Sequence, residues 1–121
     1  MTKLSEREWM VLGALWDTGG AALGEVTQAL YAQTGWSRNT VLTYLTRMEA
    51  KGLVSVGKEG YPSIYRAALS REECLAQARN SFLQNVYRGA TGDLVAAFLK
   101  ERPISPEERE ELRRLLDEME V

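Results

Sequence analysis

The sequence contains no histidine and a single cysteine, Cys74. Without histidine, the chain lacks the commonest general base and the commonest zinc ligand of proteins. One cysteine can form neither an intramolecular disulfide nor a thiolate metal cluster. The glycine-rich patterns that cradle phosphate groups do not occur either. These absences leave an enzyme poorly supported, with carboxylate catalysis formally open, and we expect no metal or cofactor.

Long apolar runs are also missing from the sequence. No stretch approaches the roughly 20 apolar residues needed to span a bilayer, and the N-terminal segment does not have the pattern of a signal peptide. We therefore expect a cytoplasmic protein that does not associate with membranes. Apolar residues make up 45% and charged residues 26% of the 121 residues, which is typical of one globular domain or of a small domain with an appendage.

The formal net charge is −2, but the charge is unevenly distributed. Residues 1–69 hold seven Lys and Arg against six Asp and Glu, whereas residues 70–121 hold eight against eleven. Positive charge gathers in the segment 36–66, where five basic residues face two acidic ones. This local excess favours nucleic-acid binding weakly. The acidic residues lie mostly in helical runs, where a solvated helix face is the usual interpretation.

Three helices are predicted in the first half of the chain. Ser5 and Glu8 form a capping-box pattern that begins the first helix, and the glycines after Asp17 end it. The second helix is expected over 23–32, and the third lies between a Ser37 cap and Gly52. The apolar spacing places these residues inward: Trp9, Leu12, Leu15, Trp16, Leu23, Val26 and Leu30.

The pattern changes to a β-hairpin after Gly52. The stretches "LVSVGK" and "SIYRAAL" are short and rich in β-branched and aromatic residues, and "EGYP" between them provides the turn. Three helices followed by a hairpin are the order of a winged helix-turn-helix. We therefore predict a mainly α chain with a winged-helix DNA-binding domain over residues 1–69.

Residues 70–121 are predicted to form a three-helix arm. Ser70 begins a helix that ends near Tyr87, a short helix follows from Thr91 or Gly92, and Ser105 caps the last one. So few residues bury too little surface to form a core alone. The arm therefore packs on the first domain or pairs with a second copy, and we favour pairing. The residues expected at the dimer interface are Leu75, Phe82, Val86, Leu94, Phe98, Leu112, Leu115, Leu116 and Met119.

The third helix has an outward face suited to reading DNA. On a helical wheel Val41, Leu45 and Met48 point to the core, and the opposite face is short, polar and lightly basic. Asn and Arg side chains pair with adenine and guanine edges, and the threonine methyl packs on thymine. Solvated threonines placed there by chance are the alternative. The residues predicted to contact DNA on this helix and the hairpin are Ser37, Arg38, Asn39, Thr40, Thr43, Thr46, Arg47, Lys51, Lys58, Tyr61 and Arg66.

Two long stretches carry a family resemblance. "LSEREWMVLGALWDTGGAALGEVTQAL" and "WSRNTVLTYLTRMEAKGLVSVGKEG" resemble the penicillinase and methicillin-resistance repressor family. The stretch "SFLQNVYRGATGDLVAAFLKERPISPEEREELRRLL" is similar to the dimerisation region of that family. The resemblance implies a homodimeric repressor that occupies a palindromic, double-stranded operator of resistance or related genes and blocks transcription sterically. It also implies that Ser37, Thr40, Thr43 and Arg47 contact the DNA.

The sequence departs from the family pattern at several positions. Many members have Pro and Lys where this chain has Arg38 and Asn39, and they have Arg where this chain has Tyr61. Induction of the resistance repressors involves a regulatory protease that cuts an Asn-Phe bond, and the matching pair here is Ala97-Phe98. The copper-responsive branch of the family ends in a cysteine cluster, which this chain, with Cys74 alone, does not have. A winged-helix protein-interaction module, or a repressor released by a small-molecule inducer, remains an alternative.

Overall fold

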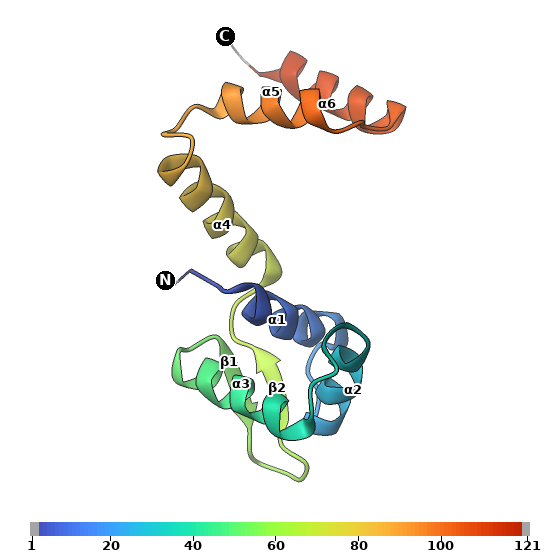
Figure 1. Cartoon of the computed structure of the whole chain (residues 1–121), viewed down its shortest axis with the longest axis vertical. Coiled ribbons are helices and arrows are strands. Elements are labelled where there is room, and N and C mark those ends of the chain that lie inside the picture. Colours follow the sequence, from blue (N-terminus) through green and yellow to red (C-terminus); the bar gives the residue numbers. More distant parts are fainter. Residues whose placement is uncertain (1–2, 120–121) are drawn as a thin grey trace. The chain divides into compact units, whose positions relative to one another are not determined.

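Residues 3–119, the part of the chain that the computed structural model describes, form six helices and one two-stranded sheet (Figure 1). The outer ends of the two expected domains, at residues 1 and 121, lie outside this range. The elements are α1 (Glu6–Thr18), α2 (Leu23–Thr34), α3 (Arg38–Ala50), β1 (Val54–Gly57), β2 (Ile64–Ala67), α4 (Arg71–Asn85), α5 (Thr91–Glu101) and α6 (Pro106–Glu118). The predicted winged-helix order followed by helices is confirmed.

The predicted helix caps are present. Ser5, Ser70 and Ser105 each accept a hydrogen bond from the backbone N–H three residues on, and the glutamate there accepts one from the serine N–H. Ser37 caps α3 through its side chain as well, because its Oγ accepts a hydrogen bond from the Thr40 N–H at 3.2 Å. The boundaries of α2 and α4 each differ from the prediction by two residues, within the usual uncertainty of helix ends.

The hairpin pairs β1 with β2 in antiparallel register, from Val54 opposite Ala67 to Gly57 opposite Ile64. A further bridge joins the loop between α1 and α2 to the hairpin. The Ala21 N–H donates to the Tyr65 carbonyl at 3.0 Å, and the Tyr65 N–H donates to the Ala21 carbonyl at 2.8 Å. This one-residue strand ties the wing to the helices.

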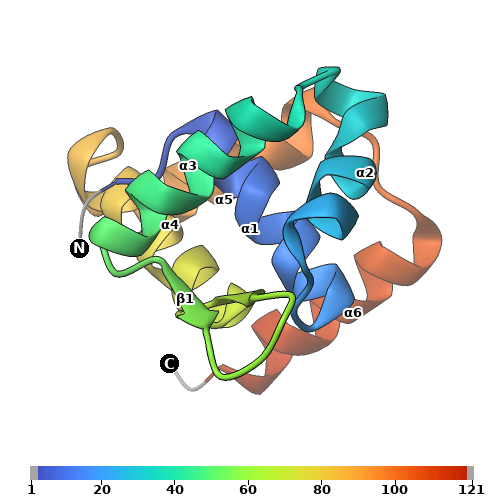
Figure 2. The ribbon, with the colours of Figure 1, turned by 90° about the horizontal axis from the view of Figure 1, so that it is seen from below.

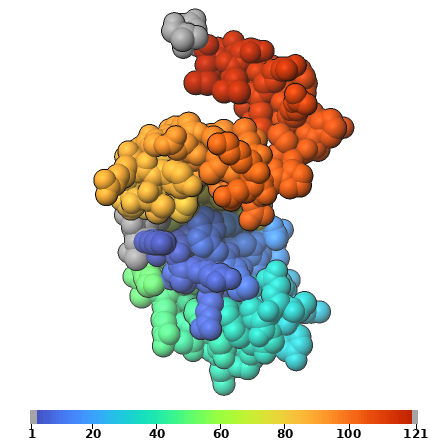
Figure 3. Space-filling model, turned by 45° about the horizontal axis from the view of Figure 1, so that its top comes forward, coloured from blue at the N-terminus to red at the C-terminus, as the bar shows by residue number. Residues whose placement is uncertain are grey.

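The chain divides into two compact units, Met1–Ala78 and Arg79–Val121. In the first unit the inward residues Leu12, Leu15, Val26 and Leu30 are buried as predicted, whereas Trp9, Trp16 and Leu23 are only partly buried and pack against this core. Figure 3 shows the blue-to-green residues of this unit filling one continuous body. The core also holds residues that the sequence analysis did not place there, namely Leu4, Val11, Ala21, Leu53, Val54 and Cys74.

Cys74 places the start of α4 in the first unit, since its side chain is buried in that core. The unit boundary therefore lies inside α4, whereas the sequence analysis divided the domains at residues 69 and 70. A packing unit and a functional domain need not share a boundary. The first turns of α4 are held by the winged-helix core.

We expect the Cys74 thiol to be unreactive in the folded protein. Burial, and then the negative charge of Glu73, raise the pKa of this thiol, and the thiolate is the form that reacts. Labelling with a disulfide reagent should be at least about 100-fold slower in the native protein than in urea, because it requires local opening. Rapid native labelling would show that the start of α4 detaches from the core.

The second unit has no buried residue within its described part, residues 79–119. Its helices and the residues directly after them carry apolar side chains that remain accessible to solvent, among them Phe82, Val86, Phe98, Leu115 and Met119. Leu94 and Leu112 are the half-buried members of the predicted apolar set in this unit. Three helices thus present apolar faces without closing a core of their own.

Candidate nucleic-acid interface

The orientation predicted for α3 is confirmed. Val41 and Leu45 are 0% exposed and Met48 is 1% exposed, so one side of the helix lies in the core. The opposite side, called the reading face below, consists of Asn39, Thr43, Thr46, Arg47 and Ala50, all of which are exposed. Thr40 is half-buried at the edge of this face.

Aromatic stacking holds the N-terminal end of α3. The rings of Trp36 and Tyr44 are stacked, with centroids 4.7 Å apart and an interplanar angle of 16°. Arg7 of α1 donates a hydrogen bond to the Tyr44 hydroxyl at 3.1 Å. Trp36 directly precedes the Ser37 cap, so the stack fixes where the helix begins. This support was not predicted from the sequence, because Arg7 and Tyr44 are 37 positions apart and no local pattern pairs them.

The threonines of the reading face have defined hydrogen bonds. The Thr43 hydroxyl donates to the Asn39 carbonyl at 2.9 Å. Its donor is therefore used within the helix, and Thr43 offers its methyl group and oxygen lone pairs outward. The hydroxyls of Ser37 and Thr40 share a hydrogen bond at 3.1 Å beside the helix start. A small, pre-oriented surface of this kind allows close approach to a groove.

Two predicted DNA contacts, Arg38 and Arg66, lie against glycines. The Arg38 guanidinium lies beside the first turn of α2. If Gly24 carried a Cβ, that atom would lie 3.5 Å from this guanidinium. An added Cβ at Gly20 would stand 2.8 Å from the Arg66 Cγ, so the stem of Arg66 crosses the loop between α1 and α2. Gly20 also has a φ of 123°, a conformation that favours glycine.

Lys51, another predicted DNA contact, forms an ion pair with Glu8. Its Nζ lies 2.8 Å from the Glu8 Oε2, and the Glu8 side chain is only 8% exposed. Burial raises the pKa of Glu8, but the hydrogen bond from Lys51, the bonds from Ser5 and the charge of Lys51 together hold that pKa below its usual 4.5. This pair fastens the C-terminal end of α3 to the N-terminal end of α1.

We expect Glu8→Gln to lower the free energy of unfolding by about 1–2 kcal/mol near pH 7, because it removes a charge-assisted hydrogen bond. The folded pKa of Glu8 is lowered, so its contribution is present above the ordinary pKa and is lost as pH falls through the folded value. Urea unfolding between about pH 7 and pH 3 should therefore show a shallower decline for the variant than for the wild type.

Glu6→Gln is the matched control, because Glu6 lies in the same first turn and is exposed. It should keep the wild-type decline of stability with acid. An identical decline for Glu8→Gln and the wild type would contradict the role given to the pair.

The hairpin loop presents two exposed side chains that were predicted to contact DNA. Lys58 is exposed and Tyr61 is 99% exposed, near the tip of the hairpin loop. In the view from below, α3 and the hairpin loop both lie toward the viewer (Figure 2). The helix α3 and the hairpin loop thus lie on one side of the first unit (Figure 2). Of the other predicted contacts, Lys51 is paired with Glu8, and the stem of Arg66 crosses Gly20.

Neither a metal-binding cluster nor a membrane-spanning helix is found in the described residues. Within residues 3–119, no group of three or more His, Cys, Asp or Glu side chains is arranged to hold a metal ion. No helix in that range is long and apolar enough to cross a membrane.

A helix-turn-helix with a polar, outward third helix and a wing is the architecture of DNA-binding transcription regulators. The model of the penicillinase repressor family matches residues 4–118, and the chain belongs to this family. Members of the family are DNA-binding transcriptional repressors. The family resemblance seen in the sequence is thereby confirmed.

Several relatives match along most of the chain. The methicillin resistance regulatory protein MecI of Mammaliicoccus sciuri is 27% identical over 115 residues, which cover 95% of this chain and 94% of MecI. The penicillinase repressor of Bacillus licheniformis is 29% identical over 116 residues, covering 96% and 91%. A solved structure of monomeric BlaI from Bacillus licheniformis in complex with the blaP half-operator has a TM-score of 0.53 and 26% identity, covering 60% of this chain and 88% of BlaI.

Proposed function

We propose that this protein is a cytoplasmic, sequence-specific repressor that binds a palindromic operator as a homodimer and blocks transcription by occupying the promoter. The orientation of α3 carries the proposal, because Val41, Leu45 and Met48 hold the helix in the core while the reading face stays exposed. Family membership and the half-operator complex of BlaI support the same function.

The reading face enters the major groove in this proposal. Asn39 and Arg47 provide side chains that pair with the edges of adenine and guanine, and the outward methyl of Thr43 packs on thymine. Ser37, Arg38 and Thr40 lie at the helix start, where the helix dipole favours a phosphate. Thr46 extends the polar face by one turn. Lys58 and Tyr61 on the wing contact the adjacent backbone or minor groove.

Lys51 and Arg66 have a smaller part in the proposed interface. The charge of Lys51 is largely compensated by Glu8, and the stem of Arg66 lies across Gly20. Both side chains are exposed, so their charges can act on nearby phosphates through solvent. The contribution of such charges to DNA affinity falls as the salt concentration rises.

The second unit pairs with its copy in this proposal. None of its described residues is buried, and even the large apolar side chains of Leu115 and Leu116 are 51% and 64% exposed. Apolar faces of this kind are covered by a partner surface in stable proteins. The interface is proposed to use Leu94, Leu112 and the exposed apolar residues Phe82, Val86, Phe98, Leu115, Leu116 and Met119, with Leu75 at the start of α4.

The regulated genes are proposed to be resistance or stress genes, and release follows from loss of dimer affinity. Ala97 and Phe98, at the position of the cut bond in the resistance repressors, lie inside α5. Cleavage there by a regulatory protease requires local unwinding of that helix. A repressor released by a small-molecule inducer is distinguished by an intact chain after induction.

Selection of genomic fragments that bind the full-length chain tests the function. The selected fragments should share an inverted repeat whose half-site centres lie about 10 base pairs, or a multiple of that, apart. A Thr43→Ala, Arg47→Ala chain serves as the control and should enrich far less of the repeat. No binding to any DNA at low salt would contradict the proposal and favour a protein-interaction module.

A further inference from the structure

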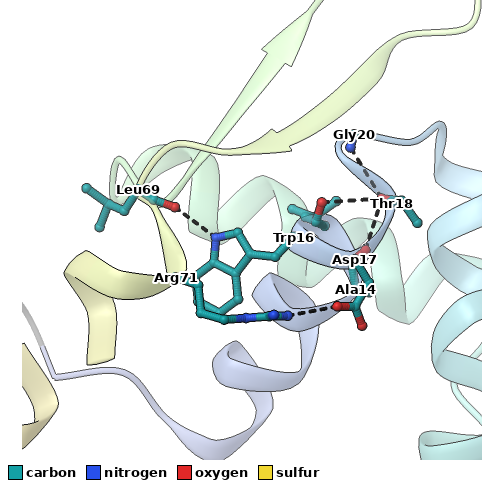
Figure 4. Close-up of polar contacts among 8 residues, drawn as sticks. Ala14, Trp16, Asp17, Thr18, Gly20, Leu69 and Arg71 are labelled. Carbon is teal, nitrogen blue, oxygen red and sulfur yellow. Dashed lines mark hydrogen bonds and ion pairs between the residues drawn. The ribbon is translucent and has the colours of Figure 1, made fainter. Parts of the chain in front are cut away.

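Four residues join the end of α1 to the start of α4, and we call them the Trp16 junction: Trp16, Asp17, Leu69 and Arg71 (Figure 4). The Trp16 indole N–H donates to the Leu69 carbonyl at 2.9 Å. The Arg71 guanidinium lies over the Trp16 ring, 5.3 Å from its centroid, and donates to the Asp17 carboxylate at 2.8 Å. All four residues belong to the first unit.

The junction fixes the first turn of α4 from two sides. Leu69 and Arg71 flank Ser70, whose capping box with Glu73 begins the helix. One turn further on, Cys74 is buried in the winged-helix core. A single contact would leave the helix free to swing about it. The hydrogen bond to Leu69, the stack of Arg71 on Trp16 and the burial of Cys74 hold the chain at three different residues, so together they fix the direction of the α4 axis.

The ion pair of the junction contributes little to the stability of the fold. The side chains of Arg71 and Asp17 are 53% and 72% exposed, and exposed pairs are weak and screened by salt. The stack of Arg71 on Trp16 adds a defined geometry to this pair. This exposed contact lies at the start of α4, the helix that continues beyond Ala78 out of the first unit, so it acts on the orientation of that helix more than on the core.

We propose that the Trp16 junction is a positioning device that sets the direction in which α4 leaves the winged-helix unit and thereby couples the two half-sites of an operator. This inference rests on the proposed dimer. Binding of the second half-site is intramolecular once the first is bound, and its effective concentration depends on how the connection directs the second unit. If the junction is loosened, the second unit samples many directions, and its effective concentration at the second half-site falls.

The test measures the affinity of the full-length chain for three duplexes. One carries a single selected half-site, one carries two at the selected spacing, and one has that spacing changed by about half a helical turn, or 5 base pairs. The wild type should favour the selected over the changed spacing by at least about tenfold. Arg71→Ala and Trp16→Phe should each bind the selected spacing about three- to tenfold more weakly, with half-site affinity unchanged within about twofold.

Arg71→Lys is the matched rescue variant, because it keeps the positive charge and should retain most of the preference for spacing. Wild-type spacing preference in both Arg71→Ala and Trp16→Phe would overturn the inference. An equal loss of half-site affinity in those variants would also overturn it, since the junction would then only support the fold. A wild type that is monomeric and indifferent to spacing would overturn the dimer as well, which distinguishes the two failures.

Discussion

Replacing Arg47 with alanine should weaken operator binding by about 10- to 100-fold, which corresponds to the loss of one good base or phosphate contact. Arg47 lies on the reading face in the last turn of α3 and is exposed, so its truncation leaves the buried side of the helix intact. If the contact is to a phosphate, the slope of log affinity against log salt concentration should also fall by about one unit. Fluorescence anisotropy with the selected operator at several salt concentrations measures both quantities.

Arg114→Ala is the control for this prediction. Arg114 lies on α6, where its guanidinium pairs with Glu111 at 3.0 Å on the exposed surface. The control removes the same charge outside the proposed DNA interface and should leave the affinity and the salt slope nearly unchanged. If Arg47→Ala binds the operator as tightly as the wild type, Arg47 does not belong to the interface.

The double variant Leu115→Asp, Leu116→Asp should be monomeric at concentrations where the wild type is dimeric. Both leucines are exposed in the isolated chain, so the folded monomer tolerates polar side chains there. In a dimer interface the two carboxylates would lose their hydration without a partner, which is costly enough to prevent association. Sedimentation equilibrium of the full-length chain measures the oligomeric state.

Arg114→Asp is the control for added negative charge on α6, because Arg114 is exposed on the same helix. It exchanges the ion pair with Glu111 for a repulsion between two carboxylates, which costs only about 0.2–0.5 kcal/mol of helix stability. This variant should remain dimeric. The monomeric double variant should keep its affinity for a single half-site and lose the advantage of two. A dimer that survives both leucine substitutions would place the interface elsewhere in the chain.

Much of the fold follows from local sequence. The Ser-x-x-Glu boxes begin helices because serine and glutamate satisfy N–H groups of the same turn, and all three predicted boxes are present. The change of pattern after Gly52, to two short stretches rich in β-branched and aromatic residues around "EGYP", identified the hairpin. The inward set of Val41, Leu45 and Met48 followed from helical geometry alone. These features depend on residues that lie close together in the sequence, within one or two helical turns or one hairpin.

The contacts that the sequence did not predict join residues far apart. Glu8 and Lys51 are separated by 43 positions, and Trp16 and Leu69 by 53. A basic residue near DNA and a basic residue paired with a buried carboxylate have the same local pattern, so Lys51 could be assigned only as a DNA contact. The bridge between Ala21 and Tyr65 spans one residue, which is too short for a strand pattern.

The central claim is that the exposed face of α3 reads a base sequence, and one titration tests it most directly. The full-length chain is titrated, at one salt concentration, with the selected operator and with a duplex of the same composition in scrambled order. The operator should bind at least about 1000-fold more tightly, the lower end of what specific DNA-binding proteins achieve. Equal affinity for the two duplexes would contradict the claim.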